Sequence, residues 1–206
     1  MISIPTLLAV GAAFWIVAAS PGPANLSNAA IAMRYGRRAS VIYGLGLSVA
    51  LVFWGILAAT GMGAVLQASA GALMVLKLLG GLYLLYLAWS SARSAAAPGA
   101  AEVAQVGAGR WFWRGVILNL SNPKSVIAWM AALSMGLDPS GSTLSVVLTT
   151  LVCVVVAFFN NLTYSLLFSL GGVMAAYRRF RSWIDGVSAA LFSLAGFALI
   201  RSAFTR

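Results

Sequence analysis

The chain has 206 residues, of which 62% are hydrophobic and only 8% are charged, and its mean hydropathy is +0.97. This composition is too apolar for a soluble domain and is typical of a protein with several membrane-spanning helices. The formal net charge of +10 does not indicate nucleic-acid binding, because the basic residues fall in short clusters between apolar runs and form no continuous face.

Histidine is absent, and the single cysteine, Cys153, lies within an apolar run. Serine–histidine catalysis, haem ligation and histidine-based zinc sites therefore lack their residues, and we expect no cofactor. An intramembrane enzyme is a rival class, but no pair of carboxylates is available for acid–base chemistry. A membrane electron conduit would need paired cysteines, so we predict neither class.

Apolar stretches long enough to cross ~30 Å of hydrocarbon recur along the chain and predict six membrane-spanning helices. In chain order they are Ile4–Met33, Ser40–Thr60, Ser69–Ser91, Trp111–Met135, Thr143–Gly171 and Trp183–Ala203. The stretch between the third and the fourth is rich in alanine and glycine and has no helical stripe. We therefore predict an all-α membrane domain with an N-terminal half (1–92), a cytoplasmic linker (93–109) and a C-terminal half (110–206).

The placement of basic residues predicts the orientation in the membrane. Alternate connections are basic, whereas Gly61–Ala68 and Gly136–Ser142 contain no Lys or Arg. The basic connections carry Arg34, Arg37, Arg38, Arg93, Arg110, Arg114, Arg178, Arg179 and Arg181. These connections are expected in the cytoplasm, so both termini face outside, although Arg201 and Arg206 oppose this. Because three helices per half is an odd number, related halves would form an inverted repeat.

Proline-containing breaks occur at corresponding positions, in the first predicted helix of each half. One contains Pro21, Gly22 and Pro23, and the other, Asn119 to Lys124, contains Pro123. Proline removes a backbone donor and clashes with the preceding turn, so the helix is kinked or interrupted there. A single break could be a packing kink, but paired breaks are typical of carriers that bind substrate between discontinuous helices.

Polar side chains near the breaks and inside the helices complete a set of candidate substrate-binding residues. Amide side chains can serve groups that have lost backbone partners, and a lysine within a span is a functional candidate by default. The candidates are Pro21, Gly22, Pro23, Asn25, Lys77, Asn119, Asn122, Pro123, Lys124, Asn160, Asn161 and Tyr164.

Several of these candidates also have a structural interpretation. The ammonium of Lys124 could extend to the cytoplasmic interface, and Asn160, Asn161 and Tyr164 could join helices by hydrogen bonds. Adjacent residues point in different directions on a helix, so we expect only one of the two asparagines to face a cavity. Lys77 lies ~12 Å inside its span and could be neutral, face a wet cavity, or meet backbone carbonyls or a ligand carboxylate.

Three motifs follow one another in order along the chain. They are Pro21-Gly22-Pro23, Leu76-Lys77-x-x-Gly80-x-x-Tyr83-Leu84-x-Tyr86-Leu87 and Asn119-x-x-Asn122-Pro123-Lys124. Together they resemble the LysE/RhtB family of amino-acid exporters over essentially the full chain. Ser40 departs from the resemblance, because glycine would be expected four residues after Gly36. The resemblance implies efflux of amino acids or close derivatives across the bacterial inner membrane, driven by the proton-motive force.

The residue inventory narrows the expected substrate. The acids Glu102, Asp138 and Asp185 are expected in connections or at helix ends, so no deep carboxylate is available for a cationic substrate. Lys77, Lys124 and helix N-termini favour a carboxylate, which indicates a neutral, zwitterionic amino acid moved by alternating access.

The expected partners are the amino acid, protons as coupling ion and membrane lipid, and a homodimer is left open. The alternative is an uncoupled channel or a non-transporting structural subunit, because proton coupling normally uses Asp, Glu or His within the membrane.

Overall fold

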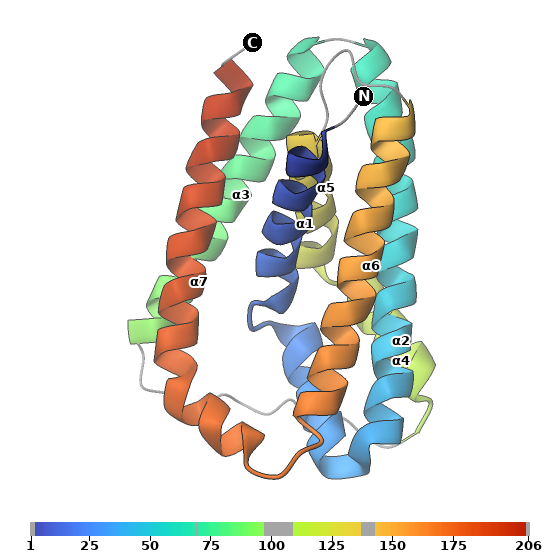
Figure 1. The fold of residues 1–206 in the computed structure, drawn as a ribbon, viewed down its shortest axis with the longest axis vertical. Helices are drawn as coiled ribbons and strands as arrows, with labels where there is room; N and C mark the ends of the chain where they lie inside the picture. Colours follow the sequence, from blue (N-terminus) through green and yellow to red (C-terminus); the bar gives the residue numbers. More distant parts are fainter. Residues whose placement is uncertain (1–2, 69, 97–108, 137–142, 205–206) are drawn as a thin grey trace.

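A computed structural model describes residues 3–68, 70–96, 109–136 and 143–204, and the regular elements in these ranges are seven α-helices. They are α1 (Ile4–Ala19), α2 (Pro23–Ala68), α3 (Ala70–Ala96), α4 (Trp111–Leu120), α5 (Pro123–Gly136), α6 (Thr143–Leu167) and α7 (Val173–Phe204). Most of the helices follow the long axis of the molecule, and both termini lie at the same end of it (Figure 1). The predicted all-α class is confirmed across the described residues.

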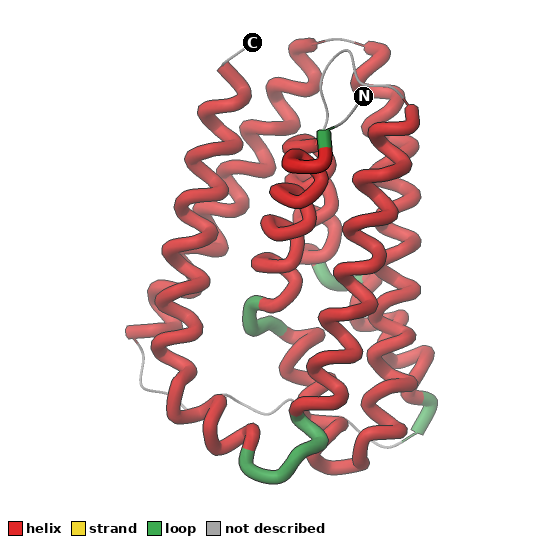
Figure 2. Tube along the Cα trace, in the orientation of Figure 1, coloured by secondary structure: helices red, strands yellow, loops and turns green. Residues whose placement is uncertain are grey.

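Both predicted breaks are present as short non-helical segments between helices (Figure 2). The first separates α1 from α2, and the second separates α4 from α5. Pro23 and Pro123 are each the first residue of a helix, where a missing backbone N–H costs nothing because that N–H has no intrahelical acceptor. The prolines therefore end one helix and begin the next, and they do not kink a continuous one.

Gly36 alone departs from helical geometry within α2, and the chain reverses direction there (Figure 1). Its φ of 84° and ψ of 172° are open to glycine and strained for a residue with a Cβ. The sequence predicted a longer connection between Met33 and Ser40, which is wrong because one glycine makes the turn. The helix also continues through Gly61–Ala68, which was predicted to be a connection.

Two further predicted boundaries differ from the structure. α7 begins at Val173 and not at Trp183, so the arginine cluster that was predicted to be a loop is helical. The arginines at 178, 179 and 181 interrupt the apolar run, so a search for a long apolar stretch begins the helix too late. α3 continues to Ala96, so the predicted linker begins later than residue 93. Residues 97–108 of the linker lie outside the described residues.

The side chains are distributed as expected for a protein surrounded by lipid. Three of the described helices are long and apolar enough to cross a membrane, namely Pro23–Gly61, Thr143–Leu167 and Val173–Phe204. On α6, Val155 and Phe159 are 66% and 62% exposed, whereas Asn160 and Ser165 are buried. An apolar exterior over a polar interior would be a liability in water and suits hydrocarbon.

The helices pack mainly across the two halves of the sequence. α2 packs on α6 and α4, α3 packs on α7, and α1 packs on α5 and α6. Between α2 and α4 the backbones approach closely, because a Cβ on Gly46 would collide with the Phe112 carbonyl and one on Gly115 with the Tyr43 carbonyl. The halves are therefore interleaved into one body.

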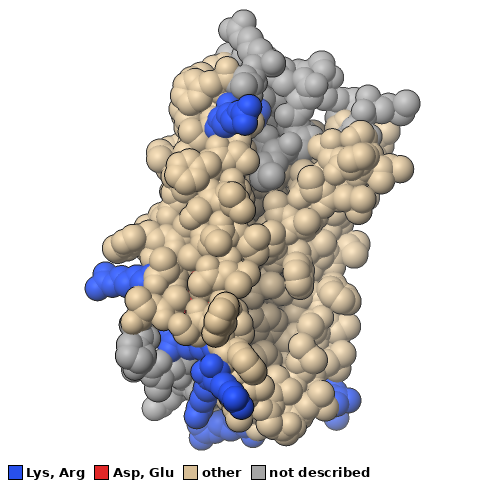
Figure 3. Space-filling model, turned by 60° about the vertical axis from the view of Figure 1, so that its left-hand side comes forward, with Lys and Arg blue, Asp and Glu red and all other residues tan. Residues whose placement is uncertain are grey.

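On the face drawn in Figure 3, most of the visible Lys and Arg side chains gather toward one end of the molecule. This end is opposite to the end that holds both termini. Arg178, Arg179 and Arg181, near the start of α7, belong to this end, whereas Arg201 lies in the last turn of α7, toward the end that holds the termini.

Candidate functional site

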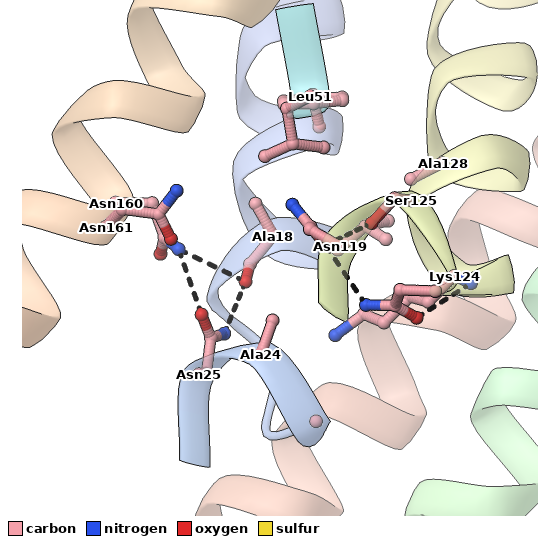
Figure 4. A pocket seen from close by; sticks show the side chains of 14 residues that line it. Ala18, Ala24, Asn25, Leu51, Asn119, Lys124, Ser125, Ala128, Asn160 and Asn161 are labelled. Carbon is pink, nitrogen blue, oxygen red and sulfur yellow. Dashed lines mark hydrogen bonds between the residues drawn. The ribbon is translucent and has the colours of Figure 1, made fainter. Parts of the chain in front are cut away.

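The two helix breaks, far apart in the sequence, lie side by side (Figure 4). Lys124, in the first turn of α5, donates a hydrogen bond from Nζ to the carbonyl of Ser20 at 2.9 Å and a second to the Ser20 hydroxyl. Ser20 follows the last residue of α1. The lysine thus joins the C-terminal end of α1 to the N-terminal end of α5.

Side chains from α2 and α6 serve the backbone carbonyls at the end of α1. Asn25 donates from Nδ2 to the carbonyls of Ala18, at 2.6 Å, and Ser20, at 3.0 Å. Asn160 of α6 lies 3.4 Å from the Ala18 carbonyl and 3.3 Å from Asn25 Oδ1. The last carbonyls of a helix have no intrahelical donor, so these amides supply what the break removes.

Tyr164 and Asn161 extend the same polar region along α6. Tyr164 donates its hydroxyl to the carbonyl of Ala19 at 2.8 Å, and Asn161 Nδ2 donates to Ser48 Oγ at 2.9 Å. Asn160 and Asn161 both line the cavity between the breaks, so the expectation that only one would face it is wrong. Their amides bind different partners, Asn160 the Ala18 carbonyl and Asn25, and Asn161 the Ser48 hydroxyl.

At the second break, the side-chain amides of Asn119 and Asn122 form hydrogen bonds with neighbouring groups. Asn119 accepts from Ser125 Oγ at 2.6 Å and donates to the carbonyl of Leu47 at 2.8 Å. Asn122 Oδ1 accepts from the backbone N–H of Lys124 at 3.1 Å, which is the geometry of a helix N-cap on α5. The predicted pair Asn119 and Asn122 thus supplies hydrogen-bond partners at the break, and Asn122 caps the start of α5.

A cavity of about 40 Å³ lies between the breaks, with polar and apolar walls (Figure 4). Lys124 is the charged residue among the fourteen that line it. The apolar wall includes Phe14, Leu51 and Ala128. At ~10–15 Å³ for each water molecule, this volume holds about three waters, so an amino acid fits only after the cavity widens.

The chain matches the family model described as LysE type translocator over residues 15–203. It belongs to this family. The motif resemblance stated above is therefore confirmed, and with the apolar exterior it makes the chain a helical membrane protein.

The translocator is similar to efflux proteins of several bacteria. It is 30% identical over 190 residues to the threonine efflux protein of Escherichia coli (strain K12), covering 89% of this chain and 91% of that one. It is 28% identical over 172 residues to the homoserine/homoserine lactone efflux protein of Salmonella typhimurium, covering 83% and 80%. It is 29% identical over 131 residues to the cysteine/O-acetylserine efflux protein of Klebsiella pneumoniae, covering 63% and 65%. No solved structure gives a significant match.

The translocator holds Lys77 apart from the other candidates. Its Nζ lies 3.3 Å from the carbonyl of Ser202, in the last turn of α7. Among the alternatives that the sequence left open for Lys77, the structure shows a contact with a backbone carbonyl. Lys77 thus joins α3 to α7, whereas Gly22, Asn25, Asn119, Asn122, Lys124, Asn160 and Asn161 come together around the cavity.

Asp185 is buried, 3% exposed, on α7 of the translocator, so placing it at a helix end was wrong. It accepts from Ser94 Oγ at 2.7 Å and lies 3.5 Å from Arg181 Nε. The error follows from the late predicted start of α7. The spacing of Arg181 and Asp185, four residues apart in a helix, is the signal that could have identified the pair.

Sequence reasoning also missed Ser20 and the apolar wall of the cavity. Ser20 precedes the first proline, and its hydroxyl and its carbonyl both accept hydrogen bonds from Lys124 Nζ. Phe14, Leu51 and Ala128 are ordinary residues of apolar helices, and no local pattern marks the side that faces a cavity.

Proposed function

We propose that this LysE type translocator exports small neutral amino acids from the cytoplasm by alternating access, with the cavity between the breaks as its substrate site. One observation carries the proposal: the carbonyl end of α1 and the ammonium of Lys124 meet in one cavity. The printed names of the relatives, which are efflux proteins for threonine, homoserine and cysteine, support an amino-acid substrate.

The charges around the cavity suit a zwitterion. The C-terminal end of α1 carries a partial negative charge that attracts an ammonium group, and the N-terminal end of α5 and Lys124 attract a carboxylate. No acidic side chain is among the residues that line the cavity in the described chain. A cationic side chain would therefore lack a partner, and a short neutral one meets the apolar wall of Phe14, Leu51 and Ala128.

The proposed membrane arrangement has six spans. α1 and the start of α2 form the first span, the remainder of α2 the second, α3 the third, α4 with α5 the fourth, and α6 and α7 the last two. Packing of α2 on α6, of α3 on α7 and of α1 on α5 supports an inverted repeat, because each span then contacts its counterpart. The gathering of basic residues opposite both termini supports an orientation with both termini outside the bacterial inner membrane.

Counterflow in proteoliposomes tests the proposal. Vesicles loaded with unlabelled threonine and diluted into labelled threonine should accumulate label transiently, because a carrier exchanges one substrate for another. Serine, homoserine and cysteine should compete, whereas arginine should not. An imposed proton gradient should accelerate net efflux if protons are coupled. Flux without counterflow would indicate a channel, and no flux of any neutral amino acid would indicate a structural subunit.

A further inference from the structure

The ammonium of Lys124 lies at the carbonyl end of α1, where the proposed function puts the amino group of a substrate. We propose that Lys124 is an internal occupant of the substrate site: in the empty carrier its ammonium holds the carbonyl end of α1. It leaves for the substrate's carboxylate when an α-amino acid brings its own ammonium there. This inference rests on the function proposed above and adds the recognition of an intact α-carboxylate.

The partners of Lys124 show that its charge is only partly compensated. Nζ lies 2.9 Å from the carbonyl of Ser20 and also binds the Ser20 hydroxyl, and both acceptors are neutral oxygens. A positive charge in a membrane interior is costly unless a negative charge or many dipoles oppose it. A substrate carboxylate would supply this negative charge, which the cavity lining itself lacks.

The helix ends explain why the lysine reaches across the cavity. Lys124 belongs to the first turn of α5, where the positive end of the helix dipole disfavours a cation. The C-terminal end of α1 favours one. Gly22 leaves the space that the ammonium uses, because a Cβ there would lie 3.3 Å from Nζ.

The replacement of the Lys124 ammonium by the ammonium of the substrate accounts for selectivity for amino acids over simple amines. An amino acid replaces Lys124 at the carbonyls and pairs with it through the carboxylate, so the positive charges stay balanced. An amine without a carboxylate would have to displace Lys124 and would leave two positive charges in one cavity, which repel each other in a medium of low dielectric. The lysine thus excludes simple amines that fit the cavity by size.

The test compares threonine with 1-amino-2-propanol, which is threonine without its carboxylate. Each is titrated into the purified full-length protein in detergent, and the apparent affinity is read from the rise in the thermal unfolding midpoint. The wild-type protein should be stabilised by threonine and not by the amine. Lys124→Met keeps the apolar stem and removes the charge. It should weaken threonine binding about tenfold or more and strengthen amine binding by a similar factor.

Lys77→Met is the matched control, because it removes the same charge from a lysine bound to the Ser202 carbonyl outside the cavity lining. It should keep the wild-type preference. If Lys124→Met does not fold, Lys124→Gln is titrated in its place. Weakened threonine binding without any gain for the amine would overturn the inference and leave Lys124 as a simple carboxylate ligand. Wild-type binding of both compounds in the variant would also overturn it. A wild-type protein that binds no neutral amino acid would instead refute the proposed function, and this inference with it.

Discussion

At the scale of single residues, the chemistry of a broken helix decides which side chains gather. The carbonyls at the end of α1 that lack intrahelical partners require hydrogen-bond donors. The side-chain amide of asparagine supplies two such donors. Asn25, Asn119 and Asn122 could therefore be identified from their positions near the breaks, and Asn160 from its place among polar residues within an apolar span. Lys77 and Asp185 could not be placed in the same way, because their surroundings depend on which helix packs beside them.

Asn25 should be the most sensitive of the amides, because it serves two carbonyls at once. Asn25→Ala leaves the carbonyls of Ala18 and Ser20 without their shared donor, at a cost of about 1–3 kcal/mol in the free energy of unfolding. The counterflow rate should fall further than this loss of stability alone would explain, because the proposed function has the same carbonyls bind substrate. Thermal unfolding and counterflow are measured on the same preparation, and unchanged counterflow would speak against a role for this carbonyl end.

Ala128 should set the size of the accepted side chain, because it is 7% exposed and lines the apolar wall of the cavity. Ala128→Leu adds three carbons to that wall. We expect the affinity for threonine and homoserine to fall about tenfold or more, as overpacking costs ~1–3 kcal/mol, while alanine and glycine lose less. Competition of each amino acid against labelled substrate gives the ratios. An equal loss of affinity for all four amino acids would show that the side chain of the substrate does not lie against Ala128.

At the scale of helices, the sequence predicted a boundary correctly where a single residue type, such as proline, restricts the backbone conformation. The prolines located both breaks to within a few residues, because proline is excluded from a helix interior and accepted at its start. The start of α7 escaped the same reasoning, since no proline marks it at Val173 and the arginines at 178, 179 and 181 break the apolar run that was used to find the span. The tight reversal at Gly36 likewise depends on a single backbone conformation, and the sequence shows only the glycine.

The close approach of α2 and α4 makes a prediction at this scale. Gly115→Ala puts a methyl group against the Tyr43 carbonyl and should lower the free energy of unfolding by ~1–3 kcal/mol, because a backbone has to move. Gly61→Ala is the matched control, since its Cβ would meet nothing within 4 Å and alanine favours a helix. Thermal unfolding in detergent decides, and equal midpoints for the two variants would contradict the packing described here.

At the scale of the whole molecule, the arrangement of charge defines a direction. Cysteine variants Ser3→Cys and Gly171→Cys place a thiol near the terminal end and near the basic end, and both native positions are exposed. Cys153 is fully buried and should stay unreactive in both variants. An impermeant maleimide added to intact cells should label the first variant, and the second only after the membrane is opened. The reverse pattern would invert the proposed orientation.

The small volume between the two breaks limits how much water can stand there. About three water molecules fit in the cavity itself. A continuous file of water across ~30 Å of hydrocarbon would need many more. The rings of Phe14 and Trp129 pack 4.9 Å apart beside this space and are almost wholly buried. At this level of the membrane, the idle protein therefore offers ions a far narrower aqueous path than an open pore would.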